Sequence, residues 1–482
     1  MALFVLTLTP LIAALASLTV RRSVRFLELI AVLAALLECA ATAVAAMAVF
    51  SDDRYQRGAY LSVDALGMVV MLTVALVGTA ASVYSIGYLR QEVVKKIIGF
   101  RRVKQYFVLF HLFLMAMFYA IVTVNPIMMW IAIEATTLST AFLISFYNKP
   151  TAMEAAWKYL IINSIGLLLG FFGTLLFFAA VSSAAAGAFV TWEMLLAAAG
   201  TLNPLLVKIA FLFILIGYGT KTGLVPMHTW LPDAHSKAPS PISALLSGAL
   251  LNCALLAILK FKVITDAALG AAFSQNLLIF FGMISIAIPA FIIIVQKNYK
   301  RLFAYSSIEH MGIITLGFGF GGFGSFAALL HMIYHSLAKS ILFFSAGNCL
   351  LKYGSTKIDR VSGVLETLPG TGKTLFLGFL AITGVPPFGI FLTEVYILSA
   401  GIASHPVVVL IALLLLALIF VGFLRFIAAM VFGAAPEPVA QGEANSLTIV
   451  PPIILLALLL GASLYLPPPL KAWISAAAAL IQ

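Results

Sequence analysis

Residues 203–226 read NPLLVKIAFLFILIGYGTKTGLVP, an apolar run of membrane-spanning length that ends in a lysine, a glycine and a proline. A second apolar run, residues 373–402, contains Thr-Gly-Val-Pro-Pro-Phe-Gly at positions 383–389. Proline lacks the backbone N–H and clashes with the preceding turn, so each helix must break there. Within lipid, broken backbone is tolerated only where protein or a water-filled cavity satisfies it. The two stretches therefore predict a membrane protein with two discontinuous helices that face its interior.

The rest of the chain has the composition of a membrane protein. Of its 482 residues, 63% are hydrophobic and 9% are charged, and the mean hydropathy is +1.13. An ordinary soluble domain carries roughly 25% charged residues. Apolar runs recur from end to end, each long enough to cross the ~30 Å hydrocarbon layer as a helix. No part of the chain is left over for a second, soluble domain.

The apolar runs predict an all-α integral membrane protein with about fourteen transmembrane helices. They lie near residues 2–20, 26–50, 60–88, 105–124, 126–147, 157–181, 203–235, 240–264, 273–296, 302–320, 324–351, 373–402, 406–432 and 447–470.

The positions of lysine and arginine test this count independently, because short cytoplasmic loops hold the excess of both. Of the 28 such residues, 19 follow odd-numbered runs, whereas 5 follow even-numbered runs or lie in the C-terminal tail. A miscounted helix would blur this asymmetry. We therefore expect a multi-pass protein of a prokaryotic cytoplasmic membrane with both termini on the outer face. The net charge of +11 then needs no nucleic acid to explain it.

The two helix breaks lie five runs apart, so the second broken run crosses in the opposite direction to the first. This is the pattern of an inverted-topology repeat. We expect helices 1–3 in residues 1–104, a first five-helix repeat (helices 4–8) in 105–264, a second inverted repeat (helices 9–13) in 273–432, and helix 14 in 447–482. The alternative is that the prolines only kink their helices and have no role in a mechanism.

Ionisable side chains lie inside the runs, although a charge at the bilayer centre costs ~2.5–3.5 kcal/mol on insertion scales. Glu134 is in the middle of run 5, and Lys221 is at the break of run 7. The two side chains form a pair if these runs pack together. Burial disfavours the charged form of a lysine and a nearby carboxylate favours it, so a pair that opens and closes would switch a proton.

A second set of ionisable residues lies in runs 10–12. His331, His335 and Lys339 follow one another at intervals of four residues, so they share one face of a helix. Histidine titrates near neutral pH, which suits a proton relay. Further stations in the neighbouring runs are Glu309, His310 and Glu394. Static buried ion pairs that only orient the helices remain the alternative.

The sequence contains no complete motif for binding a cofactor. Cys39, Cys253 and Cys349 lie inside apolar runs without any CxxC spacing, so no iron–sulfur, zinc or nickel–iron site is predicted. Residues 370–374 look like the end of a phosphate loop but lack its first glycine. We expect no cofactor and no metal in this chain.

Several motifs resemble the antiporter-like subunits shared by respiratory complex I, Mrp-type cation/proton antiporters and membrane-bound energy-converting hydrogenases. The resemblance is carried by residues 130–134, 219–236, 301–307, 331–339 and 387–394. Within that family, residues 134–140 and 307–312 are most similar to the F component of hydrogenase-4.

The resemblance implies roles for the residues named above. Glu134 and Lys221 would form the gating pair, the histidines and lysine of run 11 would carry protons across, and Glu394 would occupy the terminal site. Many relatives place Lys or His in helix 8 where this chain has Asn252, so the link between the half-channels would run through water or the amide. The further pathway candidates are Asn252, His228, Glu309, His310 and Lys208.

The sequence therefore predicts a proton-translocating membrane subunit with no redox centre of its own. It would be driven by other membrane and hydrophilic subunits of a hydrogenase or complex I-like assembly, and any enzymatic activity would belong to the complex. Two alternatives stay open. One is a stand-alone or Mrp-type Na⁺/H⁺ antiporter subunit, and the other is a structural membrane anchor.

Overall fold

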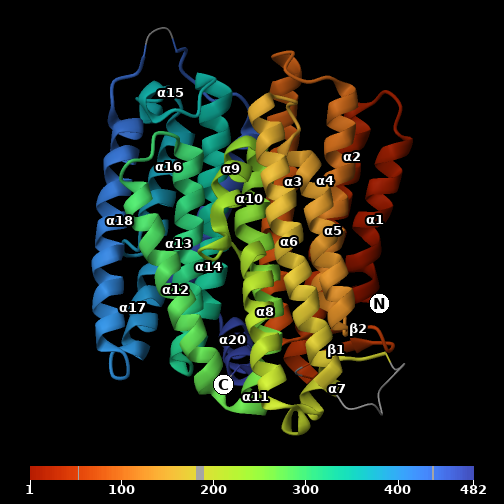
Figure 1. The fold of residues 1–482 in the computed structure, drawn as a ribbon. Helices are drawn as coiled ribbons and strands as arrows, with labels where there is room; N and C mark the ends of the chain where they lie inside the picture. Colours follow the sequence, from red (N-terminus) through yellow and green to blue (C-terminus); the bar gives the residue numbers. More distant parts are fainter. Residues whose placement is uncertain (53, 181–188, 437–438, 482) are drawn as a thin grey trace.

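The structure is a computed structural model that describes residues 1–52, 54–180, 189–436 and 439–481. Long helices run side by side in one bundle, and a short β-hairpin lies at one end of it (Figure 1). The two strands pair antiparallel, with Arg54 opposite Asp64. The expected all-α membrane fold is confirmed.

The first part of the chain forms one side of the bundle. Its elements are α1 (Ala2–Thr19), α2 (Val24–Asp52), β1 (Arg54–Arg57), β2 (Leu61–Asp64), α3 (Ala65–Val94), α4 (Phe100–Val122), α5 (Pro126–Ile144) and α6 (Pro150–Ala180).

The middle part contains the first broken helix and the most deeply buried elements. It comprises α7 (Trp192–Ala197), a 3-10 turn (Ala199–Thr201), α8 (Pro204–Thr222), a 3-10 turn (Met227–Thr229), α9 (Trp230–Lys237), α10 (Ser240–Leu245), a π turn (Leu246–Leu250), α11 (Leu251–Leu269), α12 (Ala271–Ile293), α13 (Tyr299–Phe320) and α14 (Phe323–Tyr353).

The last part contains the second broken helix. It comprises a 3-10 turn (Ile358–Arg360), α15 (Val364–Thr367), α16 (Pro369–Ile382), α17 (Gly389–Gly401), α18 (Pro406–Phe432), a 3-10 turn (Ser446–Thr448), α19 (Val450–Leu464) and α20 (Pro468–Leu480).

Twelve helical segments in the described residues are long and apolar enough to cross a membrane. Two predicted runs fall outside this set although both are helical. The run 302–320 corresponds to α13, whose charged and polar residues lower its hydropathy, and the run 373–402 is divided into the two shorter helices α16 and α17. The chain is thus a multi-span membrane protein, and the count of fourteen stays a prediction.

Several predicted boundaries differ from the observed ones. Residues 61–64 belong to β2, and α3 starts only at Ala65, where the Asp64 carboxylate accepts a hydrogen bond from the Gly67 N–H (2.7 Å). The predicted run 447–470 ends early, because prolines 467–469 stop the helix and a separate helix, α20, packs against α3 and α14. Residue 181, the last of run 157–181, lies outside the described residues.

Both predicted helix breaks are present. Helix α8 ends at Thr222, and the next residue, Gly223, has a φ of 84°. Helix α16 ends at Ile382, and Gly384 has a φ of 64°. Residues other than glycine rarely adopt such left-handed backbone, so glycine suits both positions. The division of the chain into two inverted repeats stays a prediction.

The interior of the bundle is formed by α10, α11, α13 and α14, most of whose residues are buried. Helices α1, α2, α18 and α19 expose many large apolar side chains, as lipid-facing helices do. Both termini lie toward the end of the bundle that holds β1, β2 and α7, whereas α15 lies at the opposite end (Figure 1).

Candidate functional site

Lys221 lies in the last turn of α8, immediately before the break, and its side chain is fully buried. Its Nζ donates hydrogen bonds to Thr137 Oγ1 (2.8 Å) and to the Tyr159 hydroxyl (2.7 Å). Among the described residues, no carboxylate oxygen lies within 4.0 Å of this nitrogen. The lysine is therefore held by neutral hydroxyl groups from α5 and α6.

Glu134 lies on α5, and its carboxylate does not contact Lys221 directly. Its Oε2 accepts a hydrogen bond from Thr137 Oγ1 (3.2 Å), and its Oε1 accepts one from Ser164 Oγ (2.9 Å). Thr137 is three residues after Glu134 on the same helix face, so its hydroxyl stands between the two charges. The direct pair that the sequence suggested is thus replaced by a bridge. A hydroxyl that accepts from the lysine and donates to the carboxylate is suited to passing a proton.

The line of residues on α14 forms as predicted from its four-residue spacing. His331, His335 and Lys339 are all fully buried on this helix. Lys339 Nζ donates to the Phe303 carbonyl (3.0 Å) and to Ser306 Oγ, both on α13. The lysine is thus anchored on a neighbouring helix without an acidic partner within 4.0 Å among the described residues.

The two histidines of α14 differ in their contacts. His331 Nε2 lies 2.9 Å from His310 Nδ1, and His331 Nδ1 lies 2.8 Å from Thr393 Oγ1. Neither ring nitrogen of His335 has a hydrogen-bond partner among the described residues, although its ring centroid is 5.4 Å from that of His310. His331 is therefore connected to α13 and α17, whereas His335 contacts α13 only through its ring.

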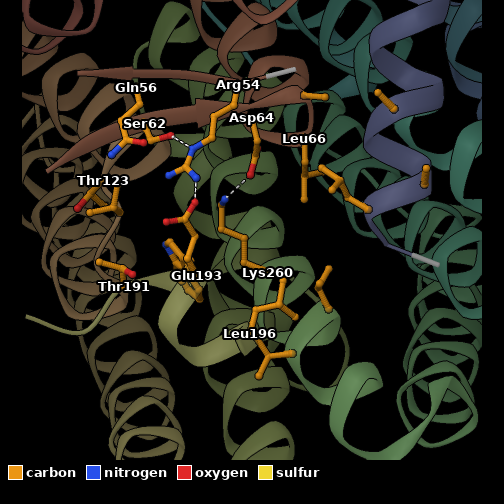
Figure 2. A pocket seen from close by; sticks show the side chains of 18 of the residues that line it. Arg54, Gln56, Ser62, Asp64, Leu66, Thr123, Thr191, Glu193, Leu196 and Lys260 are labelled. Atoms are coloured by element: carbon orange, nitrogen blue, oxygen red, sulfur yellow. Dashed lines mark hydrogen bonds and ion pairs between the residues drawn. The ribbon is translucent and has the colours of Figure 1, made fainter. Parts of the chain in front are cut away.

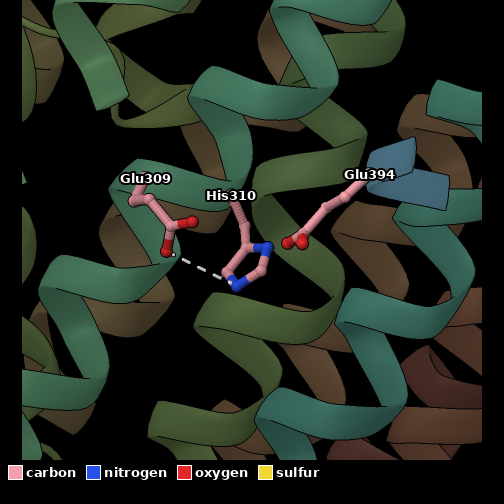
Figure 3. Close-up of side chains that lie close together, drawn as sticks. All are labelled: Glu309, His310 and Glu394. Atoms are coloured by element: carbon pink, nitrogen blue, oxygen red, sulfur yellow. Dashed lines mark ion pairs between the residues drawn. The ribbon is translucent and has the colours of Figure 1, made fainter. Parts of the chain in front are cut away.

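Glu309, His310 and Glu394 come together between α13 and α17 (Figure 3). One ligand atom from each lies within 4.8 Å of the other two. The Glu309 Oε2 atom is 3.5 Å from His310 Nε2. A Cβ atom on Gly384, at the second helix break, would collide with the Glu394 carboxylate. The break in the helix therefore makes room for this carboxylate.

His235, at the end of α9, is a candidate that the sequence analysis quoted in a motif but did not select. Its ring lies between Trp230 (centroids 6.3 Å apart) and Phe343 (5.4 Å apart). Trp230 in turn contacts Tyr159 (5.0 Å), which binds Lys221. Both ring nitrogens of His235 are buried and lack partners among the described residues.

The surroundings of His235 place it between the two lysines. Phe343 is four residues after Lys339 on α14, so it shares the helix face of Lys339 and His335. A row of aromatic rings thus leads from Tyr159 at the Lys221 site through His235 to Phe343, on the helix that carries Lys339. The sequence alone did not select it, because His235 follows the break in a short helix and belongs to no periodic pattern.

Asn252 forms no hydrogen bond with either lysine in the part of the chain that the structure describes. Its Nδ2 donates to Ser336 Oγ (2.9 Å) and to the Gly248 carbonyl (3.3 Å), within and beside the π turn. Its Oδ1 has no partner among the described residues. Asn252 therefore contacts α14 at the residue that follows His335.

The two remaining candidates are His228 and Lys208. His228 is almost buried in the 3-10 turn after the first break, and its Nδ1 lacks a partner among the described residues. Lys208 is exposed near the start of α8, 5.9 Å from the centroid of the Phe273 ring. Lys208 is thus separate from the buried line.

A cavity of about 540 Å³ lies at the end of the bundle that carries the hairpin (Figure 2). Asp64 Oδ2 and Lys260 Nζ are 2.9 Å apart there, and Arg54 forms an ion pair with Glu193. Burial alone would raise the pKa of Asp64, but Lys260, the Gly67 N–H and Arg54 outweigh it and lower the pKa below 3.8. The four charges pair among themselves, and none of the predicted relay residues lines this cavity.

Known proteins share both sequence and fold with this chain. A relative from Methylacidiphilum infernorum, "Hydrogenase-4 component F homolog", is 38% identical over 88% of this chain and 89% of its own length. "Hydrogenase-4 component B" of Escherichia coli is 28% identical over 70% of this chain, which spans only 50% of that relative. A subunit in the structure of an archaeal membrane-bound sulfane sulfur reductase has the same fold, with a TM-score of 0.87 at 23% identity over 100% of this chain and 97% of that subunit.

The family profile described as "NADH:quinone oxidoreductase/Mrp antiporter, TM" matches residues 123–420, which include both broken helices and every buried lysine, glutamate and histidine of the line described above. The chain therefore belongs to this family of antiporter-like membrane subunits.

Proposed function

We propose that this chain is the proton-translocating subunit of a redox-driven membrane complex of the hydrogenase-4 or complex I type. The observation that carries the proposal is the buried line of ionisable and hydroxyl groups that runs from Glu134 to Glu394 past both helix breaks. Ionisable residues inside a membrane are costly and face pathways or partners. A line of this length fits a path for protons better than it fits static ion pairs, because its two lysines have no acidic partner within 4.0 Å in the part of the chain that the structure describes.

The first segment of the path would be the group around the first break. A proton on Lys221 can reach Glu134 through the Thr137 hydroxyl without a change of rotamer on α5, since both contacts exist at once. The Tyr159 hydroxyl offers Lys221 a second neighbour on α6. Gating would then consist of breaking and remaking the lysine contacts at the end of α8.

The second segment would cross the middle of the bundle at His235. Its two ring nitrogens, which have no partner among the residues described, and its contacts with Trp230 and Phe343 support a relay that works with water molecules. This would replace the route through a basic residue in helix 8, where this chain has Asn252. Histidine can take up a proton at one ring nitrogen and release it from the other, which suits transfer between two sites.

The third segment would run from Lys339 to Glu394. Ser306 connects Lys339 to the cavity that Glu309 and Glu394 line. His310 and His331 are joined to each other and, through Thr393, to α17. Glu394 would be the terminal site of the path.

The energy that moves the proton would come from partner subunits. Moving one proton against 100 mV costs ~2.3 kcal/mol, which electron transfer in partner subunits would have to supply. The names of the relatives, components of hydrogenase-4, support other membrane and hydrophilic subunits as these partners.

We place the chain in a prokaryotic cytoplasmic membrane with the α15 end on the cytoplasmic side, because the loops rich in lysine and arginine follow odd-numbered runs. We assign no cofactor to the chain itself.

Replacing Lys221 by alanine tests the proposal, with Lys208→Ala as a matched control on the same helix. Each variant is assembled into its complex in inverted membrane vesicles, and redox turnover and proton uptake are recorded together. We expect Lys221→Ala to lose proton uptake while Lys208→Ala retains it. Unchanged proton uptake in an assembled Lys221→Ala complex would favour the structural-anchor alternative and refute the proposal.

A further inference from the structure

A groove of about 860 Å³ lies where α1 ends, α4 begins and α5 ends. Helix α4 packs against both α1 and α5, and the three helices stand side by side in Figure 1. All three are long and apolar enough to cross a membrane. Because the groove lies at their ends, it lies at the membrane surface, where lipid headgroups meet the protein.

The polar side chains that line the groove present hydrogen-bond donors. Arg21, Arg101 and Lys104 line it and carry positive charge. Gln105 also lines it, and its Oε1 already accepts a hydrogen bond from Arg102 (2.8 Å), so its amide N–H groups remain as donors. No aspartate or glutamate lines the groove in the part of the chain that the structure describes. Such a lining suits an anion with several acceptor oxygens, such as a phosphate group.

The positive charge around the groove is not balanced by nearby acidic residues. Residues 18–27 contain three lysines and arginines, residues 93–110 contain five, and neither segment contains an aspartate or glutamate. Among the described residues, neither Arg21 nor Arg101 forms an ion pair within 4.0 Å. Charges of one sign repel one another, so a bound anion would stabilise this corner of the molecule.

Lys104 places one of these charges at a fixed position. Its Nζ donates hydrogen bonds to the carbonyls of Leu18 (2.5 Å) and Val20 (3.1 Å) at the end of α1. An ammonium group has three donors, so one remains for an anion in the groove. Because the amine is held before a ligand arrives, less conformational entropy is lost on binding.

An apolar strip continues from the charged end of the groove. Leu109 lines the groove more than one turn beyond Lys104 along α4, and Leu112 and Met115 follow it on the same helix face, all three half-buried. Phe142 of α5 lines the groove with an exposed ring. Cations at the membrane surface with an apolar strip below them match a phosphate that carries an acyl chain. A free phosphate would leave the strip unused.

We propose that this groove binds one anionic phospholipid, with the phosphate between Arg21, Arg101 and Lys104 and an acyl chain along α4. Basic pockets between transmembrane helices on the cytoplasmic side bind anionic headgroups, and the proposed topology places these loops on that side. The inference goes beyond the proposed function, because none of the residues of the proton path lines the groove in the part of the chain that the structure describes.

Binding of phosphatidylglycerol to the purified full chain in a neutral detergent tests the site. Native mass spectrometry counts the bound lipids, and phosphatidylcholine, which has no net charge, is titrated in parallel. We expect the first phosphatidylglycerol to bind about tenfold more tightly than phosphatidylcholine. Excess inorganic phosphate should not displace it, because phosphate has no acyl chain. Equal affinity for the two lipids, or displacement by phosphate, would overturn the proposal.

The double variant Arg21→Gln/Arg101→Gln locates the site. Both side chains are exposed, so the variant should fold, and its affinity for phosphatidylglycerol should fall about tenfold or more while that for phosphatidylcholine stays the same. Lys357→Gln/Arg360→Gln is the control. It removes the same charge from the segment before α15, which lies across the bundle from α1 (Figure 1). An equal loss in both variants would indicate general attraction to a basic surface and refute a site in the groove.

Cross-linking in the assembled complex identifies what occupies the groove in the membrane. A photoreactive group attached in place of Gln105 should label phospholipid. Labelling of a protein subunit in its place would show that a partner covers the groove and would overturn the assignment to a lipid.

Discussion

Two threonines in successive positions on α5 differ in the hydrogen bonds that their hydroxyl groups form. The hydroxyl of Thr137 contacts both Lys221 and Glu134. The hydroxyl of Thr136, equally buried, donates to the Ile133 carbonyl of its own helix. Only Thr137 can therefore pass a proton between the two charges.

Thr137→Val should lower proton uptake by the assembled complex about tenfold, because the isosteric side chain removes one hydrogen-bonded step of the path. Uptake is measured in inverted vesicles at a matched rate of redox turnover. Thr136→Val is the control and should stay within about twofold of the wild type. Equal effects of the two substitutions would show that the hydroxyl bridge is not used.

The sequence could predict which charges are buried but not what they touch. Lys221, Lys339 and the two histidines of α14 were found from their positions within apolar runs. Thr137, Tyr159 and Ser306, which hold the lysines, have no unusual feature in the sequence, because hydroxyl residues are common in membrane helices. Their roles depend on which helices pack together, and packing is not visible in one chain's periodicity.

Among the helices, the break between α16 and α17 depends on one glycine. Gly384 has a φ of 64°, and a Cβ atom there would collide with the Glu394 carboxylate. Glu394 could not keep its position against the break if this residue had a side chain. The proline motifs predicted the break itself, whereas the fit between the glycine and the carboxylate follows only from the packing of α17.

Gly384→Ala should lower the free energy of unfolding by about 1 kcal/mol or more, since alanine is strained at a positive φ. Gly461→Ala in α19 is the control, because a Cβ atom there would meet no neighbour within 4 Å and alanine favours a helix. Thermal unfolding of both variants measures the difference. A Gly384→Ala protein as stable as the control would contradict this account of the break.

The start of α3 offers a test that is independent of transport. Asp64 caps this helix and pairs with Lys260 in the cavity beside the hairpin. Asp64→Ala should cost about 1 kcal/mol at pH 7, as the loss of an N-cap does. Lys260, the Gly67 N–H and Arg54 lower the pKa of Asp64 despite its burial.

The sign of the pH dependence of this test follows from the lowered pKa. A carboxylate with a depressed pKa stabilises the fold above its unfolded-state value and loses this contribution as the pH falls through its folded-state value. The difference between wild type and variant should therefore shrink below about pH 4. Urea unfolding at several pH values measures it, and a difference that grows on acidification would contradict the ion pair.

Across the whole molecule, the ring of His235 stacks on Phe343 of α14, although α9 itself packs mainly against α6 and α13. The proline motifs predicted the two broken helices, and the motifs around the buried charges predicted the family to which the chain belongs. The sequence did not predict the contact between His235 and Phe343, because this contact depends on how the short helix α9 packs after the break. The sequence shows Asn252 at the position in helix 8 where many relatives have a basic residue. It does not show which group would take over the role of that residue.

The central claim is that the two groups of charges form one path through His235, and proton uptake by the assembled His235→Phe complex tests it most directly. Phenylalanine keeps the packing against Trp230 and Phe343 and removes both ring nitrogens. His111→Phe is the matched control, since His111 is also buried and has two ring nitrogens without a partner among the residues described, but it lies on α4 and belongs to neither group of charges. We predict that His235→Phe loses proton uptake at unchanged assembly while His111→Phe retains it, and normal uptake by the His235→Phe complex would contradict the account.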